Sequence, residues 1–438
     1  MSRRRREPET ARIAAVTHDG RGIAELPGKK VFVAGALSGE QVRFQRRKSR
    51  RSFDEAELLD VIEASPQRIE PRCAVFGRCG GCALQHVSNS EQRELKSQAL
   101  RDSLERIGKV QAASWLEPIV GSPWHYRRRA RLAVKDVRAK GRVLVGFRER
   151  HAPFITDMHR CEVLATPIDT MLDPLSELIG ALSIRARLPQ IEVAVAENAV
   201  ALVFRVLDRP TAADESLLRE FGAAHDTRIY LQSGGIDSVE MLHPSTAVDA
   251  LSYSLPEFDL CVEFDPTGFV QINSDVNRRM VSRAVELLDP GAGDRVLDLF
   301  CGIGNFSLPL ARRSHEVLGI DGEASLVAAA ARNAARNGLH NAAFRAADLS
   351  AVDGTEAWLR QGCDRLLLDP ARSGAAAIVR HMPALGAERI VYVSCHPGTL
   401  ARDAGSLVNE QGYRLEAAGI IDMFPHTAHV ESIALFIK

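Results

Sequence analysis

Residues 294–307 read DRVLDLFCGIGNFS, the stretch that decides the fold of the last part of the chain. It starts with a short apolar run between aspartates, of the length of a buried strand. Gly302 and Gly304 then predict a tight turn, and the residues after them suit a helix. Nucleotide cofactors bind where a strand, a glycine turn and a helix follow one another. The stretch therefore predicts a doubly wound α/β domain with a cofactor at the turn.

Acidic side chains follow the later strands of the predicted sheet. The run 317–320 ends in Asp321, about 20 residues after the turn, where an acid accepts hydrogen bonds from ribose hydroxyls. Asp348 and Asp369 follow two further strand-like runs. Any one of these acids is read equally well as a solvated loop residue or a helix N-cap. The ordered series of strand ends favours a cofactor site.

The glycine pattern discriminates between two cofactors. An oxidoreductase that binds NAD uses a third glycine, which leaves room for the pyrophosphate to approach the backbone. Ser307 stands at that position in this chain. We therefore predict S-adenosylmethionine rather than NAD as the cofactor.

Another predicted strand of the sheet ends in a cysteine. Residues 390–400 read IVYVSCHPGTL, a buried strand that ends in Cys395 at a proline–glycine turn. Ligands of open α/β sheets bind at this end of the strands. Taken alone, the cysteine is more simply read as a small apolar packing residue. The neighbouring cofactor pattern favours a catalytic thiol.

Four motifs occur in the order that is typical of one enzyme family. They are DLFCGIGNF at 298–306, LDPAR at 368–372, VSCHP at 393–397 and FPHTAHVE at 424–431. Through them the chain resembles the RNA uracil-C5 methyltransferase family over nearly its whole length, and within it the members that methylate a uridine of 23S ribosomal RNA. The alternatives are a uracil-C5 methyltransferase of tRNA or of another ribosomal RNA site and, from another class, a non-catalytic RNA-binding iron–sulfur protein.

The resemblance implies a multidomain protein with three parts. Residues 1–65 would form an OB-like β-barrel of the TRAM type behind a basic N-terminal tail, and 66–261 a β-rich central RNA-binding domain with an iron–sulfur cluster. Residues 262–438 would form the Rossmann-like S-adenosylmethionine-dependent methyltransferase domain. A helix expected at about 90–110 is a candidate for packing on the catalytic domain.

The resemblance also implies a covalent mechanism. Carbon 5 of uracil is a poor nucleophile until a thiolate adds to carbon 6, and Cys395 matches the family's thiolate. Glu431 matches the general base that removes the proton from carbon 5. The residues implied to line the cofactor pocket are Gln271, Phe300, Asn305, Asp321, Asp348 and Asp369.

Asp369 is also expected to face the reacting uracil, where a carboxyl group bonds the imide edge of the ring. Two residues depart from the family's pattern. Asp321 stands where glutamate is usual, and a shorter acid reaches a ribose if its strand lies slightly closer. His396 stands where asparagine is usual, and a structural role is favoured because adjacent strand residues point to opposite faces.

Three cysteines lie close together in a glycine-rich segment. Cys73, Cys79 and Cys82 have the spacing Cys-x5-Cys-x2-Cys, and Cys161 is the nearest cysteine downstream. Four thiolates suit zinc or an iron–sulfur cluster, with a redox pair at Cys79 and Cys82 as a further reading. The family resemblance implies a 4Fe-4S cluster held by all four.

Charge is unevenly distributed, although 56 basic and 56 acidic residues cancel. Residues 1–60 carry fourteen Lys and Arg against nine Asp and Glu, including the run 46–51. Residues 121–150 carry ten against two, with Trp124, His125 and Tyr126 directly before three arginines. Mixed basic and aromatic groups suit a folded single-stranded RNA. A solvated charged surface is the alternative, and it is the preferred reading of the tail Arg3–Arg6.

The cellular setting is also an expectation. The scattered cysteines do not suggest a disulfide framework, and the chain has neither a signal peptide nor an apolar run that could cross a bilayer. We expect a cytoplasmic monomer that binds RNA, with no DNA or membrane partner.

Overall fold

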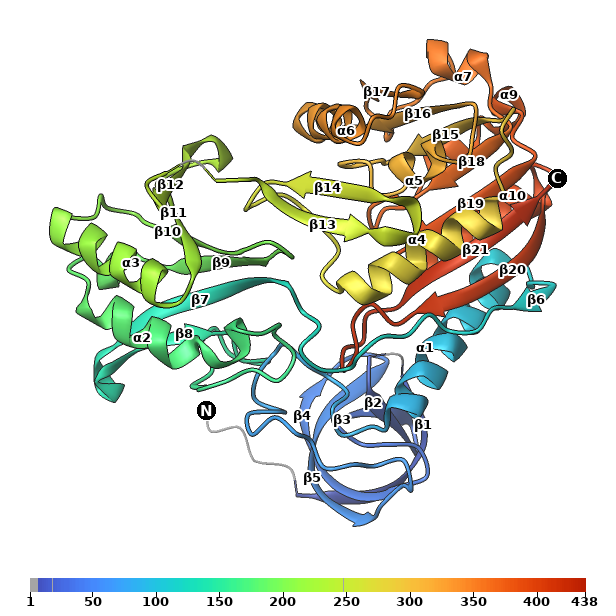
Figure 1. The fold of residues 1–438 in the computed structure, drawn as a ribbon. Helices are drawn as coiled ribbons and strands as arrows, with labels where there is room; N and C mark the ends of the chain where they lie inside the picture. The colour runs from blue at the N-terminus through green and yellow to red at the C-terminus, as the bar shows by residue number, and fades with distance from the viewer. Residues whose placement is uncertain (1–6, 18, 247) are drawn as a thin grey trace. The chain divides into compact units, whose positions relative to one another are not determined.

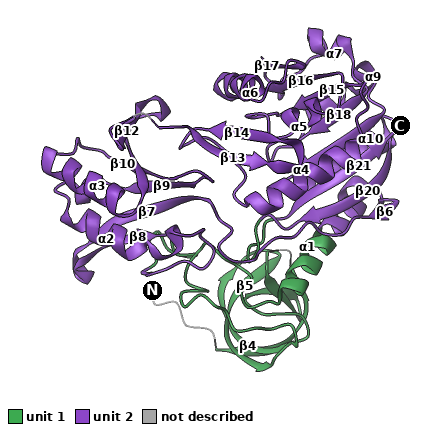
Figure 2. Ribbon diagram, viewed as in Figure 1, with its two compact units in different colours: residues 1–99, 148–156, 424–429 green, residues 100–147, 157–423, 430–438 purple. Residues whose placement is uncertain are grey.

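The structure is a computed structural model that describes residues 7–17, 19–246 and 248–438 (Figure 1). The basic tail Arg3–Arg6 lies outside the described residues. Two compact units are present (Figure 2). The first consists of residues 1–99, 148–156 and 424–429, and the second of residues 100–147, 157–423 and 430–438.

The first unit contains a closed five-stranded barrel with the strand order β1-β2-β3-β5-β4. The strands are β1 (Glu9–Val16), β2 (Arg21–Leu26), β3 (Lys29–Ala34), β4 (Gln41–Ser49) and β5 (Phe53–Glu63). Side chains that alternate along the strands fill its interior, including Ile13, Val31, Val33, Val42 and Phe44, all at most 1% exposed. The prediction of an N-terminal β-barrel is confirmed.

The helix expected at about 90–110 is shorter and less regular than predicted. Helix α1 (Asn89–Ser103) is followed by a π-helical turn at Leu104–Gly108, where Lys109 adopts a left-handed conformation. Leu100 and Leu104 are buried, whereas Ile107 is 55% exposed. The π-helical turn packs against α10 (Pro397–Asn409), where Asn409 donates a hydrogen bond to the carbonyl of Gly108.

A six-stranded sheet in the second unit has the order β12-β11-β10-β9-β7-β8. Its strands are β7 (Arg129–Val137), β8 (Arg142–Gly146), β9 (Gln190–Val195), β10 (Val200–Arg205), β11 (Thr227–Gln232) and β12 (Val239–His243). This confirms a β-rich centre. The sequence did not predict the helices α2 (Leu172–Ala181) and α3 (Ala212–Ala224), which pack on β8 and β11. A hairpin of β13 (Leu251–Leu255) and β14 (Leu260–Phe264) follows.

An eight-stranded sheet with the order β17-β16-β15-β18-β19-β21-β20-β6 forms the rest of the second unit. Its strands are β6 (Ser114–Trp115), β15 (Arg295–Leu299), β16 (Glu316–Asp321), β17 (Ala342–Ala346), β18 (Arg365–Leu368), β19 (Arg389–Ser394), β20 (Arg414–Ile421) and β21 (Glu431–Ile437). The helices are α4 (Ser274–Leu288), α5 (Ser307–Ala311), α6 (Ala324–Arg336), α7 (Ala357–Gln361), α8 (Ala376–Val379), α9 (Met382–Leu385) and α10. Every strand predicted between residues 294 and 394 is present.

The order of this sheet explains where a ligand can bind. Strands β15 to β19 run parallel, and β21 is antiparallel to both β19 and β20. The chain progresses outward from β15 to β16 and β17, then returns to the other side of β15 at β18. Ligands of open α/β sheets bind at the carboxyl ends of strands at such a reversal. Separately, no helix in the described ranges combines the length and apolarity needed to cross a membrane.

Candidate active site

The glycine turn after β15 follows an unusual backbone path. Phe300, Gly302 and Gly304 have positive φ angles of 66°, 53° and 95°. A left-handed conformation is costly for a residue such as Phe300, and it is held because the backbone amides of Phe300 and Cys301 both donate to the carbonyl of Ile320. A Cβ atom on Gly302 would meet nothing within 4 Å, so the space beside this residue is open. The turn thus has the room that a cofactor site needs.

Asp321 is fixed to the glycine turn. Its Oδ2 accepts a hydrogen bond from the backbone amide of Gly302 at 3.0 Å, and its Oδ1 accepts one from Glu323 at 3.0 Å. Each carboxylate oxygen has a second lone pair with which to accept a further bond. The shorter acid is therefore close to the turn, as its predicted role requires.

Asn305 lies at the end of the turn, and two side chains hold its amide. Tyr253 Oη donates to Asn305 Oδ1 at 2.8 Å, and Asn277 Nδ2 donates to the same oxygen at 3.0 Å. Asn305 Nδ2 donates in return to Asn277 Oδ1 at 3.0 Å. The structure therefore joins the hairpin β13–β14, helix α4 and the glycine turn at one predicted cofactor residue.

Gln271 lies in the irregular segment that precedes α4. The backbone amide of Arg128 donates to the carbonyl of Ile272 at 2.9 Å, and the guanidinium of Arg129 donates to the carbonyl of Pro266. Burial lowers the pKa of Arg129 to about 10. Two of the three arginines expected to contact RNA thus hold the segment that carries Gln271.

Asp348 is less closely connected to the site. It is exposed after β17, and its Oδ1 accepts hydrogen bonds from the backbone amide and the hydroxyl of Ser350. These bonds, the hydroxyl bond first, lower the pKa of Asp348. Within residues 7–17, 19–246 and 248–438, no hydrogen bond or ion pair joins it to another predicted site residue.

Two carboxyl groups at the strand ends have raised pKa values. Burial raises the pKa of Asp369, after β18, to about 7. Burial also raises the pKa of Asp298, inside β15, to about 7, against the effect of a hydrogen bond from Ser307 and with the charges of Asp369 and Asp321 contributing. Asp298 is fully buried, and its Oδ1 has no hydrogen-bond partner among the residues that the structure describes. Both groups therefore exchange a proton near neutral pH.

Cys395 and Glu431 lie at the same edge of the sheet. Ser394 pairs with Ser432 in the register of β19 and β21, so each predicted catalytic residue is a direct neighbour of this pair. Burial raises the pKa of Cys395 to about 11, and the negative charges of Glu431 and Asp369 add to the effect. Arg372 acts in the opposite direction. The sulfur is consequently a protonated thiol at neutral pH in this state of the protein.

His396 has a structural position. It is the N-cap of α10, and its Nδ1 accepts a hydrogen bond from the backbone amide of Thr399 at 3.2 Å. Its own backbone amide donates to Ser394 Oγ. An asparagine can make the same cap, which explains how histidine replaces it here.

The loop with the three close cysteines belongs to the first unit. Cys79 is buried, and the backbone amide of Gly81 donates a hydrogen bond to Cys79 Sγ at 3.4 Å. Such amide–sulfur hydrogen bonds are common around iron–sulfur clusters, so this thiol-rich loop fits the group. Cys161 is buried in the second unit. Among the described residues, no cluster of three or more His, Cys, Asp and Glu side chains has the geometry of a metal site.

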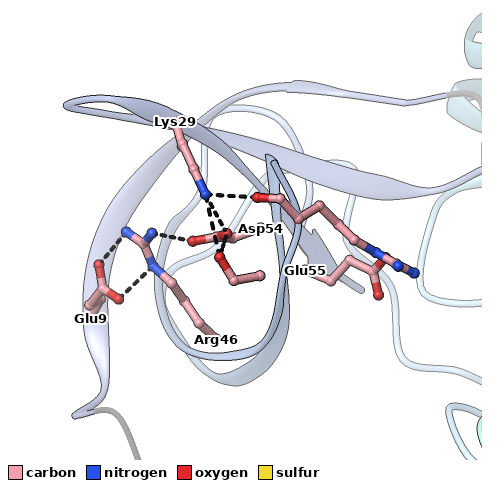
Figure 3. Close-up of polar contacts among 7 residues, drawn as sticks. Glu9, Lys29, Arg46, Asp54 and Glu55 are labelled. Atoms are coloured by element: carbon pink, nitrogen blue, oxygen red, sulfur yellow. Dashed lines mark hydrogen bonds and ion pairs between the residues drawn. The ribbon is translucent and has the colours of Figure 1, made fainter. Parts of the chain in front are cut away.

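The basic run at residues 46–51 is largely neutralised within the barrel. Arg46 forms ion pairs with Glu9 and Asp54, and Lys29 lies 3.5 Å from Asp54 (Figure 3). Arg47 pairs with Glu57, and Arg50 pairs with Glu55. The excess of basic residues in the sequence therefore overstates the positive charge that this face offers to RNA.

Comparisons with known proteins agree with the fold and the family. Residues 121–438 match the family described as tRNA (Uracil-5-)-methyltransferase. Proteins named 23S rRNA (uracil(1939)-C(5))-methyltransferase RlmD are similar over their whole length. The one from Nitrosococcus oceani is 52% identical, covering 98% of this chain and 96% of that protein. The one from Methylococcus capsulatus is 50% identical, covering 98% and 97%.

A solved structure has the same fold. The crystal structure of Pyrococcus abyssi tRNA (uracil-54, C5)-methyltransferase in complex with S-adenosyl-L-homocysteine matches with a TM-score of 0.75 and 24% identity. The match covers 98% of this chain and 100% of that one.

The sheet order and the glycine turn define an S-adenosylmethionine-dependent methyltransferase. The chain belongs to the RNA uracil-C5 methyltransferase family, as its motifs predicted.

Sequence reasoning assigned no role to four residues that the structure brings to this edge. Asp298 and Arg372 were inside recognised motifs, and their acidic and basic side chains were the available signal. Asn277 follows the segment with Gln271, and Tyr253 lies on β13. Nothing in the local sequence links these last two to Asn305, because the contact depends on tertiary structure.

Proposed function

We propose that this enzyme transfers a methyl group to carbon 5 of a specific uridine in 23S ribosomal RNA, the uridine equivalent to 1939. One observation carries the chemistry: a thiol, Cys395, lies at the ligand-binding edge of the sheet within the electrostatic influence of two carboxyl groups, Glu431 and Asp369. The substrate is supported by full-length identities of 48–52% with proteins named for that uridine.

The proposed reaction starts at the sulfur. Cys395 loses its proton, and the thiolate forms a bond to carbon 6 of the uracil, so that the electron pair of the 5,6 double bond moves into an enolate. Arg372 favours the thiolate, because its positive charge lowers the pKa of Cys395. S-adenosylmethionine, when bound, would supply an electrophilic methyl group: carbon 5 bonds to it as the carbon–sulfur bond of the sulfonium breaks, which leaves S-adenosylhomocysteine.

Release requires a base. Glu431 takes the proton from carbon 5, the electron pair restores the 5,6 double bond, and the bond between carbon 6 and the sulfur breaks. Asp369, with a pKa of about 7, can donate a hydrogen bond to the imide edge of the ring while it is protonated. In our proposal, Gln271, Phe300, Asn305, Asp321, Asp348 and Asp369 bind the methyl donor.

We also propose that Cys73, Cys79, Cys82 and Cys161 hold a 4Fe-4S cluster with a structural role, since methyl transfer needs no redox step. The spacing of the three close cysteines, the family resemblance and the amide of Gly81 directed at Cys79 support this assignment. Iron and acid-labile sulfide, measured on anaerobically purified protein, should be stoichiometric and should be lost in Cys79→Ser. Zinc in place of iron would contradict the cluster assignment.

The proposed organisation has three parts: a TRAM-type barrel at 1–65 that contacts RNA, a central RNA-binding domain at 66–261 and the catalytic domain at 262–438. We propose that the protein acts as a cytoplasmic monomer on RNA and not on DNA. The scattered spacing of the cysteines, which does not suggest a disulfide framework, supports a reducing compartment. Light scattering after size exclusion should give the mass of one chain, 47.9 kDa.

The test of substrate uses purified protein, S-adenosylmethionine and three RNAs: a 23S fragment around the proposed uridine, the same fragment with that uridine changed to cytidine, and unmodified tRNA. Mass spectrometry should detect one added methyl group, on the first RNA alone. Methylation of tRNA instead would replace the proposed substrate with that of the related enzymes. Methylation of none would favour a non-catalytic RNA-binding protein.

A further inference from the structure

The side-chain amide of Asn305 is held in one orientation by its neighbours. Tyr253 Oη and Asn277 Nδ2 both donate to its oxygen, and its nitrogen donates to Asn277 Oδ1. Asn277 is 3% exposed, and α4 fixes its backbone because its amide donates to the carbonyl of Asn273. Asn305 itself follows Gly304 in the glycine turn. A buried and rigid group therefore determines how this amide faces the cofactor site.

The hydrogen-bonding capacity of Asn305 leaves one group for a ligand. An amide oxygen has two lone pairs, and both are used here; an amide nitrogen has two hydrogens, and one is used. What remains is a single N–H. Without its neighbours, the amide could rotate by 180° and present its oxygen instead, since the two ends have nearly the same size.

We propose that Tyr253 and Asn277 are positioning residues that lock Asn305 as a hydrogen-bond donor toward an acceptor oxygen of S-adenosylmethionine. The acceptor is either the carboxylate of the methionine part or a ribose hydroxyl. The inference rests on the proposed role of Asn305 in donor binding. It adds Tyr253 of β13 and Asn277 of α4, which affect cofactor binding through Asn305.

A purely structural role for Tyr253 is the competing explanation, because its hydroxyl also ties the hairpin to the glycine turn. The hairpin has other anchors, however. The amides of Cys261 and Glu263 donate to Asn337 and Asn333 of the helix α6 segment, each at 2.9 Å. Removal of one hydroxyl should therefore leave the hairpin in place, and donor affinity separates the two explanations.

The test compares Tyr253→Phe with the unchanged full-length protein. Calorimetric titration with S-adenosylhomocysteine should show about 5-fold weaker binding, as expected for the loss of one hydrogen bond near 1 kcal/mol. In steady state, KM for S-adenosylmethionine should rise by a similar factor, with kcat within twofold. The matched control is Tyr413→Phe, which loses a buried hydroxyl bond to Ala387 in the same unit and should leave donor affinity unchanged.

A second variant tests the orientation directly. In Asn277→Asp the donor to Asn305 Oδ1 is replaced by a carboxylate oxygen that repels it, so the amide of Asn305 is no longer held in one orientation toward the ligand. We expect affinity for S-adenosylhomocysteine to fall by more than in Tyr253→Phe, about 10-fold or more. Titration with 5′-methylthioadenosine, which has no carboxylate, identifies the acceptor. If Tyr253→Phe binds this ligand as tightly as the unchanged protein does, the acceptor is the carboxylate. If Tyr253→Phe binds it about 5-fold more weakly, the acceptor is a ribose hydroxyl.

Two results would overturn the inference, and they differ. If Asn305→Ala weakens binding of S-adenosylhomocysteine while Tyr253→Phe and Asn277→Asp bind it as tightly as the unchanged protein, the locking of the amide is refuted. If Asn305→Ala itself binds normally, the proposed role of Asn305 fails, and the inference with it, although methylation of RNA can remain intact.

Discussion

The barrel and the catalytic edge both bury carboxyl groups, with opposite consequences. In the barrel, Asp54 is 1% exposed and pairs with Arg46 and Lys29. A hydrogen bond from Ser49, then the bond from Arg46 and the charge of Lys29, lower its pKa to about 2. At the catalytic edge, burial raises the pKa values of Asp298 and Asp369 to about 7, and neither forms an ion pair within the described chain.

The direction of the pKa shift distinguishes a carboxyl group that stabilises the fold from one that is suited to proton transfer. A buried carboxylate with cationic partners stays charged and contributes to stability, whereas burial without a cationic partner favours the neutral form, so that the group can exchange a proton near neutral pH. The barrel therefore has the charge arrangement of a rigid domain. The catalytic edge has the arrangement of a site that moves protons.

The largest expected effect is at the nucleophile. Cys395→Ser replaces a sulfur that can add to carbon 6 with a much less nucleophilic hydroxyl, so methyl transfer should fall by about 10⁴-fold, as removal of other enzymes' nucleophiles does. Methyl incorporation into the 23S fragment measures this. Affinity for S-adenosylhomocysteine is the control and should stay within twofold. Activity within tenfold of the unchanged enzyme would contradict a covalent mechanism.

The second effect is on stability of the barrel. The pKa of Asp54 is 3.8 in the unfolded chain and about 2 in the folded one. At about 1.4 kcal/mol per pKa unit, the group contributes about 2.5 kcal/mol, fully present above roughly pH 4 and lost as the pH falls through 2. In denaturant unfolding at pH 6, Asp54→Asn should have a free energy of unfolding lower by this amount than that of the unchanged protein. Between pH 4 and pH 2, its stability should decrease less than that of the unchanged protein. An equal acid dependence in both proteins would refute it.

The third effect is on thiol reactivity. Asp369→Asn and Glu431→Gln each remove a negative charge that opposes the thiolate, so Cys395 should react several-fold faster with iodoacetamide at pH 8, by up to about 10-fold. Arg372→Gln should react more slowly. Peptide mass spectrometry separates Cys395 from the other cysteines, and Cys363, buried elsewhere in the same unit, is the internal reference. If Cys395 reacts with iodoacetamide at the same rate in all three variants as in the unchanged protein, these charges do not control the reactivity of its thiol.

The smallest expected effect is on the pH dependence of stability at Asp369, which has the opposite direction to that of Asp54 in the barrel. The raised pKa of Asp369 means that its folded-state stability is greatest while the group is protonated and decreases as the pH rises through 7. Asp369→Asn, which stays neutral, should therefore be more stable than the unchanged protein at pH 8, by about 1 kcal/mol because the half-buried group remains partly hydrated. Thermal unfolding at pH 5 and pH 8 checks this. Destabilisation at pH 8 would show that Asp369 has a cationic partner.

Much of the catalytic sheet was predictable, because short apolar runs that end in polar residues specify both the strands and the edge where they meet. The glycine turn, Asp321 and Cys395 follow from such local patterns. The barrel was likewise predicted from alternating strands and turns. These features depend on residues that are neighbours in sequence.

The remaining features depend on tertiary partners. Tyr253 is 52 residues from Asn305, and no local pattern links them. The stretch with Arg128 and Arg129 was predicted to contact RNA, and the structure shows that the guanidinium of Arg129 and the backbone amide of Arg128 also bond the segment before α4, since residue type alone does not reveal such partners. For the same reason the run at 46–51 was read as free positive charge, although acids on β1 and β5 neutralise much of it.

The central claim is that the sulfur of Cys395 bonds to carbon 6 of the target uracil. The most direct measurement uses the 23S fragment with 5-fluorouridine at the target position, incubated with the enzyme and S-adenosylmethionine. Because fluorine cannot leave as a proton, the account predicts a stable adduct that carries the added methyl group and maps to the peptide with Cys395. No adduct under conditions where the normal fragment is methylated, or an adduct on another cysteine, would contradict it.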